Sequence, residues 1–424
     1  METLRTHRML VCVSARKSEK DIGGNLGLRK AIGRVFVLCV LSVAAASAQT
    51  FTTLVNFDGS NGANPDPKAL VQGADGNLYG TAQNGGANSS GTVFRMTPLG
   101  ALTTLYDFCA LPGCADGANP VPGLVLGNDG NFYGVTSGGG TSRVGTVFKI
   151  TQQGKLTTLN SLNPAIGSFP FARLVQGPDG TLYGTTPSGG NLLACSGFGC
   201  GTVFSITLGG TLSNLYSFCS QPGCSDGAVA FDGLAFGRDG NLYGTTWQGG
   251  SANLGTVFKI AGGSLTTLYS FCSLPGCADG NNPEWLTLGK DGYFYGTTFG
   301  GGAQNFGTVF VITPVGLTTL YSFCSQAACA DGAQPRAGLE LAQNTGDFYG
   351  TTYLGGSNNL GSVFKITSGQ LTTLHSFNGV DGEYPIGGIL FLPSGVAYGT
   401  TAYGGTTTDG TAFALTFPHG RANH

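Results

Sequence analysis

A set of motifs that recurs seven times is the feature of this sequence that most constrains the fold. A Tyr-Gly step falls at Tyr79, Tyr133, Tyr183, Tyr243, Tyr295, Tyr349 and Tyr398. The six steps from Tyr79 to Tyr398 average about 53 residues, a period typical of propeller blades. A segment resembling Gly-Thr-Val-Phe follows each Tyr-Gly step. The sequence therefore predicts seven copies of one structural unit.

Each unit has the pattern of four antiparallel strands. Residues 239–283 contain the pieces DGNLYGTT, GTVFKI and LTTLYSFC, in which apolar and polar residues alternate around Asp-Gly and Gly-containing turns. A fourth-strand segment also lies at residues 51–57, before the first Tyr-Gly step, and none follows the last GTVF-like segment. We expect this N-terminal strand to complete the seventh blade. The prediction is an all-β, closed seven-bladed propeller over residues 49–424, with a short C-terminal tail and no open sheet edge.

Residues 1–48 differ in composition from the rest. Arg29, Lys30 and Arg34 precede an apolar run at residues 35–46, and Ala46-Ser47-Ala48 fits a signal cleavage site. We interpret residues 1–48 as an N-terminal extension and secretory signal peptide. The run is short for a membrane span, so none is expected in the mature chain. A secreted or periplasmic location is predicted.

The charge after Ala48 argues against nucleic acid as a partner. Twelve Lys and Arg stand against 19 Asp and Glu there, a net of −7, and the basic residues are scattered singly. A protein that binds nucleic acid usually presents a basic stripe or patch. We expect no nucleic-acid partner.

The ten cysteines after residue 48 are spaced for local disulfides. They form five pairs, each with four residues between its members: Cys109/Cys114, Cys195/Cys200, Cys219/Cys224, Cys272/Cys277 and Cys324/Cys329. An even number of cysteines in an exported chain indicates a disulfide framework. Zinc is disfavoured because it needs four converging nitrogen or sulfur ligands, and only His375, His419 and His424 follow the signal segment.

The combination of DGNLYGTT, the paired glycines, GTVFKIT and LTTLYSF resembles the GloVer tandem repeat of exported bacterial proteins, which carry differing C-terminal anchors. The resemblance covers residues 51–416. It implies a repeat architecture of the β-propeller kind and an extracellular or surface location, and the family has no assigned activity. Because no apolar tail with a basic cluster ends this sequence, we expect release into the medium or periplasm.

Aspartates that precede glycine in the loop after the fourth strand form a candidate metal site. They are Asp116, Asp226, Asp279, Asp331 and Asp381. Several carboxylates on one rim of a ring could hold calcium, although calcium usually takes more of its oxygen ligands from one continuous loop. The first and third units place Asn61 and Ile166 there instead. No other cofactor is expected.

The loop between the second and third strands carries the sharpest candidate binding site. In this loop the last four units place an aromatic residue: Trp247, Phe299, Tyr353 and Tyr403. Aromatic rings on one face of a loop can stack on sugar rings or apolar ligands. The alternative is that these rings cover the loop glycines or pack on the neighbouring blade.

The repeats favour a binding function over catalysis. We expect an exported, monomeric, non-enzymatic binding or interaction scaffold whose partner is an extracellular glycan or a cell-envelope protein. One alternative is a propeller-type polysaccharide lyase or glycoside hydrolase using the non-repeated rim carboxylates Asp232, Glu284, Glu340 and Glu383. Another is a structural cell-surface protein. No catalytic residue is assigned, because no histidine has a fixed partner and no nucleophile motif occurs.

Overall fold

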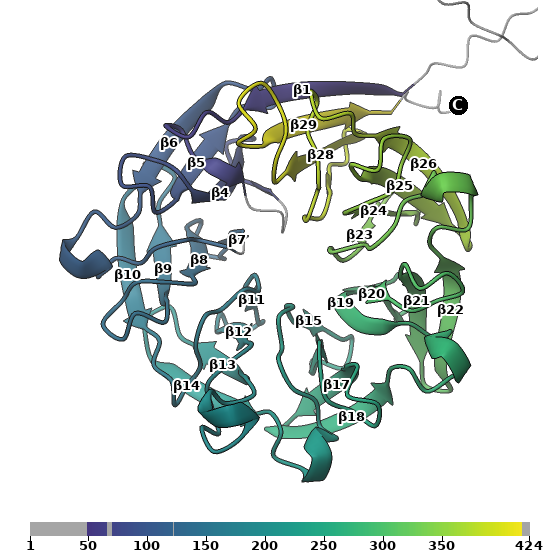
Figure 1. Cartoon of the computed structure of the whole chain (residues 1–424). Coiled ribbons are helices and arrows are strands. Elements are labelled where there is room, and N and C mark those ends of the chain that lie inside the picture. Colours follow the sequence, from purple (N-terminus) through teal and green to yellow (C-terminus); the bar gives the residue numbers. More distant parts are fainter. Residues whose placement is uncertain (1–48, 66–69, 122, 418–424) are drawn as a thin grey trace, which may run out of the picture. The chain divides into compact units, whose positions relative to one another are not determined.

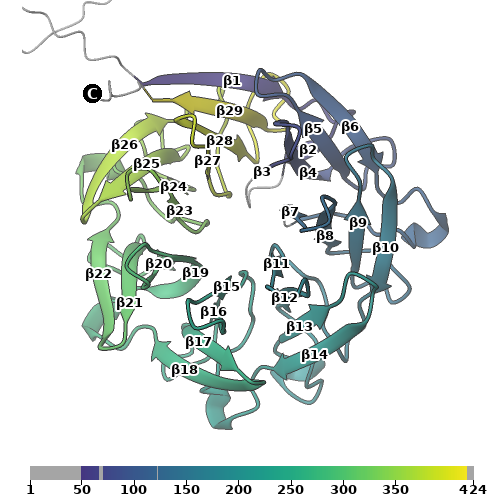
Figure 2. The same ribbon diagram turned by 180° about the vertical axis from the view of Figure 1, so that it is seen from behind.

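The computed structural model describes residues 49–65, 70–121 and 123–417. Contacts divide the chain into two units, Met1–Ala46 and Ser47–His424, and the predicted signal peptide lies outside the described residues. The second unit is a ring of seven blades, each a four-stranded antiparallel sheet (Figures 1 and 2). The predicted seven-bladed propeller is thus confirmed.

Within each blade the strands follow one another from the channel outwards. The innermost strands are β3 (Val71–Gln72), β7 (Val125–Leu126), β11 (Val175–Gln176), β15 (Ala235–Phe236), β19 (Asn281–Leu288), β23 (Glu340–Leu341) and β27 (Leu390–Phe391). The second strands are β4 (Leu78–Asn84), β8 (Phe132–Thr136), β12 (Leu182–Thr186), β16 (Leu242–Thr246), β20 (Phe294–Gly300), β24 (Phe348–Thr352) and β28 (Val396–Thr401).

The outer half of each blade is equally regular. The third strands are β5 (Thr92–Met96), β9 (Thr146–Ile150), β13 (Thr202–Ile206), β17 (Thr256–Ala261), β21 (Thr308–Thr313), β25 (Ser362–Thr367) and β29 (Thr411–Thr416). The outermost strands are β6 (Leu102–Asp107), β10 (Leu156–Ser161), β14 (Leu212–Ser217), β18 (Ser264–Ser270), β22 (Gly316–Ser322), β26 (Gln370–Ser376) and β1 (Thr50–Asn56). We number the blades 1 to 7 from β3 to β27.

The ring closes through the N-terminal strand. β1 pairs with β29 from Thr50↔Thr416 to Asn56↔Thr411, so blade 7 combines both ends of the described chain. A short extra strand, β2 (Ala63–Pro65), also pairs with β4 in blade 1. This closure is the one predicted from the offset of the repeats, and it gives blade 7 its fourth, outermost strand.

The core lies between the blades. Seven apolar clusters are formed, each from two adjacent blades, so every interface around the ring has its own core. Between blades 4 and 5, for example, Phe271 packs edge-on against Phe310 at a centroid distance of 5.2 Å. Both rings are fully buried. Repeated aromatic residues therefore stabilise the contact between neighbouring sheets.

Strand alternation gathers two kinds of loop at one end of the ring. The loop that follows a second strand and the loop that precedes a first strand meet there through short bridges, such as Ala228↔Gln248 and Ala333↔Leu354. We call this end of the central channel the mouth. The five candidate aspartates and three of the candidate aromatic residues lie in loops of this end, and Phe299 lies near the end of β20 (Phe294–Gly300) beside them. Among the described residues no helix is long and apolar enough to span a membrane.

All five predicted disulfides are present. They join Cys109 to Cys114, Cys195 to Cys200, Cys219 to Cys224, Cys272 to Cys277 and Cys324 to Cys329. Each loop contains a single 3-10 turn: η1 (Pro112–Cys114), η2 (Cys195–Gly197), η3 (Pro222–Cys224), η4 (Pro275–Cys277) or η5 (Ala327–Cys329). Such a set of disulfides is typical of proteins that work outside the reducing cytoplasm.

Candidate binding site in the central channel

The five candidate aspartates each serve their own loop. Asp279 is fully buried and accepts hydrogen bonds from the Tyr269 hydroxyl (2.9 Å) and from the backbone N–H groups of Ser273 (2.9 Å) and Leu274 (3.2 Å). Asp116, Asp226 and Asp331 repeat this arrangement. These carboxylates close the disulfide loops, because they satisfy buried donors that the turn leaves unpaired.

The fifth aspartate has a different partner. Asp381 lies 2.9 Å from Nε2 of His375, which stands where blades 1, 3, 4 and 5 have a tyrosine, and accepts the backbone N–H of Asn378 (2.9 Å). Among the described residues, the only group of three or more potential metal ligands close together is Cys195, Cys200 and Cys219, and all three are in disulfides. Calcium binding by the aspartates stays a prediction.

The four candidate aromatic residues lie along one side of the mouth. Trp247 and Phe299 are neighbours, with ring centroids 5.4 Å apart. Tyr403 is 44% exposed, whereas Trp247, Phe299 and Tyr353 are half-buried. The guanidinium carbon of Arg336 lies 4.7 Å from the ring centroids of both Phe299 and Tyr353. Part of the predicted set is thus a stack with an arginine rather than a free surface.

Further aromatic residues extend this row on both sides. Phe231 packs edge-on against Trp247 (6.1 Å) and Phe171 against Phe231 (5.7 Å). Beyond Tyr353, Tyr384 lies at 5.0 Å and then approaches Tyr403 at 6.3 Å. Tyr384 holds a left-handed backbone conformation (φ 53°), which is costly for a bulky residue. The row therefore runs from blade 3 to blade 7.

A cavity of about 350 Å³ opens in the mouth, and we call it the outer cavity. Phe171, Phe231, Trp247 and Tyr403 provide its aromatic wall. Asp232, Glu284 and Arg336 add charge to the same wall. Asp232 and Glu284 are only 3% and 5% exposed, and both already interact with other groups. Apolar rings with a few converging polar groups are the usual lining of a ligand site.

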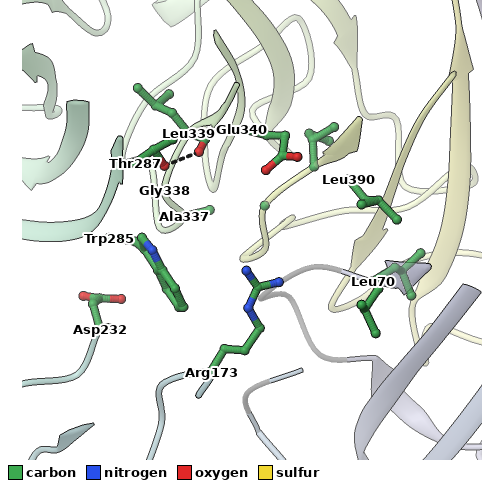
Figure 3. A pocket seen from close by; sticks show the side chains of 13 residues that line it. Leu70, Arg173, Asp232, Trp285, Thr287, Ala337, Gly338, Leu339, Glu340 and Leu390 are labelled. Carbon is green, nitrogen blue, oxygen red and sulfur yellow. Dashed lines mark hydrogen bonds between the residues drawn. The ribbon is translucent and has the colours of Figure 1, made fainter. Parts of the chain in front are cut away.

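A second cavity of about 200 Å³, the inner cavity, lies next along the first strands (Figure 3). Asp232 lines both cavities, so they adjoin. The other polar side chains of the inner cavity are Arg173, Trp285, Thr287 and Glu340. The Thr287 hydroxyl donates to the carbonyl of Leu339. Arg173, Trp285 and Glu340 are therefore the side chains considered next as contacts for a ligand.

Trp285 and Arg173 form a cation–π pair. The guanidinium carbon of Arg173 lies 5.4 Å from the centroid of Trp285, within the range of a cation–π contact (Figure 3). Two glycines make room for the indole, since a Cβ on Gly233 would lie 2.3 Å from the Trp285 ring and one on Gly338 would lie 2.7 Å from the Trp285 Cβ. Any larger residue at either position would displace the indole.

Glu340 faces the same cavity with an altered acidity. Burial raises the pKa of Glu340 to about 7, although the charge of Arg173 and the backbone N–H of Phe391 oppose the rise. Burial likewise lowers the pKa of Arg173, against the opposing charge of Glu340. A carboxyl group with such a pKa can both give and take a proton near neutral pH.

Comparing the repeats along the first strand would have found these residues. The residue before the repeated leucine or isoleucine is Gly123, Gly233, Gly338 and Gly388 in four blades, but Arg173 and Trp285 in two others. One residue after that leucine, Glu340 replaces the apolar residue found in most blades. Sequence reasoning singled out Asp232, Glu284 and Glu340 and missed Arg173, Trp285, Arg336, Phe171 and Phe231. Glu383 lines neither cavity.

The fold and the channel together define a repeat propeller with a ligand-sized cavity at its axis. The chain matches the Gloeobacter/Verrucomicrobia repeat over residues 33–258 and 233–423. It belongs to that family, and the resemblance inferred from the motifs is confirmed. No curated protein matches it.

Comparison with solved structures finds a shared fold at low identity in one of the two described next. A streptogramin B lyase superposes with a TM-score of 0.59 at 16% identity, covering 88% of this chain and 99% of that one. A gluconolactonase from Xanthomonas campestris gives a TM-score of 0.40 at 14% identity, covering 88% and 91%. At this identity the lyase indicates a common propeller fold and nothing about activity.

Proposed function

We propose that the protein is an exported binding scaffold that takes a saccharide into the mouth of its channel. The observation that carries the proposal is the aromatic wall of the outer cavity, where Trp247, Phe231 and Tyr403 surround a concavity of about 350 Å³. This volume falls in the range of small-ligand sites, and flat aromatic faces beside charged groups suit the apolar faces and hydroxyls of a sugar. The disulfides support a site of action outside the cytoplasm.

Glycan-array binding of the full chain, expressed for export so that its disulfides form, tests this proposal. Binding to a defined sugar class is expected, and the double variant Trp247→Ala, Tyr403→Ala should weaken it at least ten-fold. Tyr293→Ala is a matched control, because Tyr293 is 40% exposed in a turn at the other end of the ring. If glycan binding survives the double variant, the outer cavity is not the site.

A second candidate function is cleavage of a polysaccharide. It is supported by Asp232 and Glu340, which line one cavity, and by the pKa of Glu340 of about 7, which suits general acid–base work. Turnover of a bound polymer that is lost in Glu340→Gln would favour it. A glycan that binds tightly and is released unchanged would instead favour the scaffold.

A further inference from the structure

Two arginine side chains that line the cavities have hydrogen-bond donors without a partner among the described residues. Nε of Arg173 and Nε of Arg336 are both buried without a hydrogen-bond partner among the described residues. Within the same part of the chain, no carboxylate lies within ion-pair distance of Arg173. A buried donor without a partner costs free energy, so an arginine kept in this state indicates a group that is missing from the protein itself.

Arg173 is held so that it can receive that group. Its guanidinium carbon lies 5.4 Å from the centroid of the Trp285 ring, and the glycines of neighbouring blades leave room for that ring. A cation–π contact restrains the guanidinium without using its N–H donors. A guanidinium edge matches a carboxylate with two parallel hydrogen bonds.

The remaining charges of the inner cavity favour a single negative charge on the ligand. Asp232 and Glu340 line the cavity together with Arg173, and within the described residues these are its only charged side chains. A dianion such as a phosphate monoester would bring two negative charges to a cavity in which Arg173 is the one basic side chain among the described residues. A monoanionic carboxylate can bind to the base alone, beside an uncharged Glu340.

We propose that the inner cavity binds the carboxylate of a uronic acid, with Arg173 as its partner and Trp285 beside the sugar ring. This inference rests on the proposed function, since it names the class of saccharide whose neighbouring sugars occupy the outer cavity. Arg336, at the junction between Phe299 and Tyr353, is available to a second acidic sugar in the outer cavity.

Binding of a uronate is expected to depend on pH through Glu340. Among the described residues, the charged groups that line the cavity together with Glu340 are Arg173 and Asp232. Because its pKa is about 7, Glu340 is largely uncharged at pH 6 and largely ionised at pH 8. An ionised Glu340 repels a carboxylate, so affinity for the uronate should fall as the pH rises through 7.

Calorimetric titration of the full chain with a uronate trisaccharide and with its methyl ester tests the inference. The ester removes the negative charge of each carboxylate and adds one methyl group in its place, and trisaccharides of galacturonate, glucuronate and mannuronate cover the common sugar configurations. We expect the acid form of one of them to bind about ten-fold or more tightly than its ester at pH 6. Arg173→Gln should lower this preference several-fold, with the remainder due to Arg336 and a second carboxylate, and Glu340→Gln should remove the pH dependence.

Two further variants serve as controls for the role of Arg173. Arg173→Lys retains the charge without the fork and should recover only part of the preference, while Arg143→Gln removes an exposed arginine outside both cavities and should change nothing. Equal binding of acid and ester by the natural protein overturns the inference but leaves the saccharide site in place. Tighter binding of a sulfated trisaccharide than of any uronate also overturns it. Failure of every saccharide, neutral or acidic, overturns the proposed function as well.

Discussion

The outer strands of the blades and the strands that line the channel differ in how closely the seven copies agree. The phenylalanine of the third strand is present in all seven copies and is fully buried each time: Phe94, Phe148, Phe204, Phe258, Phe310, Phe364 and Phe413. On the channel wall, the position before the repeated leucine is glycine in most described blades, but arginine or tryptophan in two. Positions with the same residue in every copy pack one sheet against the next. Positions at which the copies differ lie on the channel wall and carry the polar groups of the site.

Alanine at a repeated position should have the largest effect on stability. Phe271 is fully buried between blades 4 and 5, so Phe271→Ala leaves a cavity in a sheet interface. We expect the free energy of unfolding to fall by about 3–5 kcal/mol. Urea unfolding followed by fluorescence measures this loss.

Phe171→Ala is the matched control for that comparison. Phe171 is the same residue type, but it lies half-buried on the wall of the outer cavity and contacts Phe231. Its removal should cost less than about 1.5 kcal/mol, because solvent already reaches the site. Equal losses for the two variants would contradict the division between packing positions and channel positions.

The fold was accessible from the sequence because its determinants are local. The Asp-Gly turns, the two-residue alternation and the offset of the first strand at residues 51–57 specify four-stranded blades and the way in which they close. The disulfides followed from a spacing that recurs in five loops. None of these inferences needed to know which residues face one another across the ring.

The site was only partly accessible, because it depends on contacts between blades. Trp247 and Tyr403 could be found as aromatic departures from a repeated loop. That Phe299 and Tyr353 both contact Arg336 could not, since Arg336 lies in the loop before β23 of blade 6 whereas Phe299 comes from β20 of blade 5. Likewise, the common cavity of Arg173 and Glu340 depends on the packing of first strands around the axis, and no periodicity within a single unit encodes that geometry.

Removing a carboxyl group from the channel should stabilise the protein, whereas removing a core side chain destabilises it. The pKa of Glu340 is raised from 4.5 to about 7 in the folded protein, so between these values the folded state binds more protons than the unfolded chain. Stability therefore falls as the pH rises through this window, and the loss persists above it. Glu340→Gln should raise the free energy of unfolding by about 1–3 kcal/mol at pH 8 and leave it nearly unchanged at pH 4. Urea unfolding at both pH values checks this, and parallel pH profiles for the two proteins would refute it.

The smallest effect on stability is expected at His375, in the outermost strand β26 of blade 6. His375 replaces the tyrosine of β26, stacks on Phe51 of the closing strand at 3.6 Å and lies 2.9 Å from Asp381. Burial lowers the pKa of His375 from 6.5, and Asp381 opposes this. Because the unfolded chain then takes up its proton at a higher pH, stability should fall as the pH drops below 6.5. The loss of unfolding free energy at acid pH should be under about 1 kcal/mol, and His375→Tyr should remove it. The reciprocal change Tyr321→His, at the equivalent position of β22, should introduce it. Unfolding midpoints of the three proteins are measured from pH 7.5 to 5.5. If the midpoint changes with pH equally in all three, His375 is not the cause of the acid-dependent loss of stability.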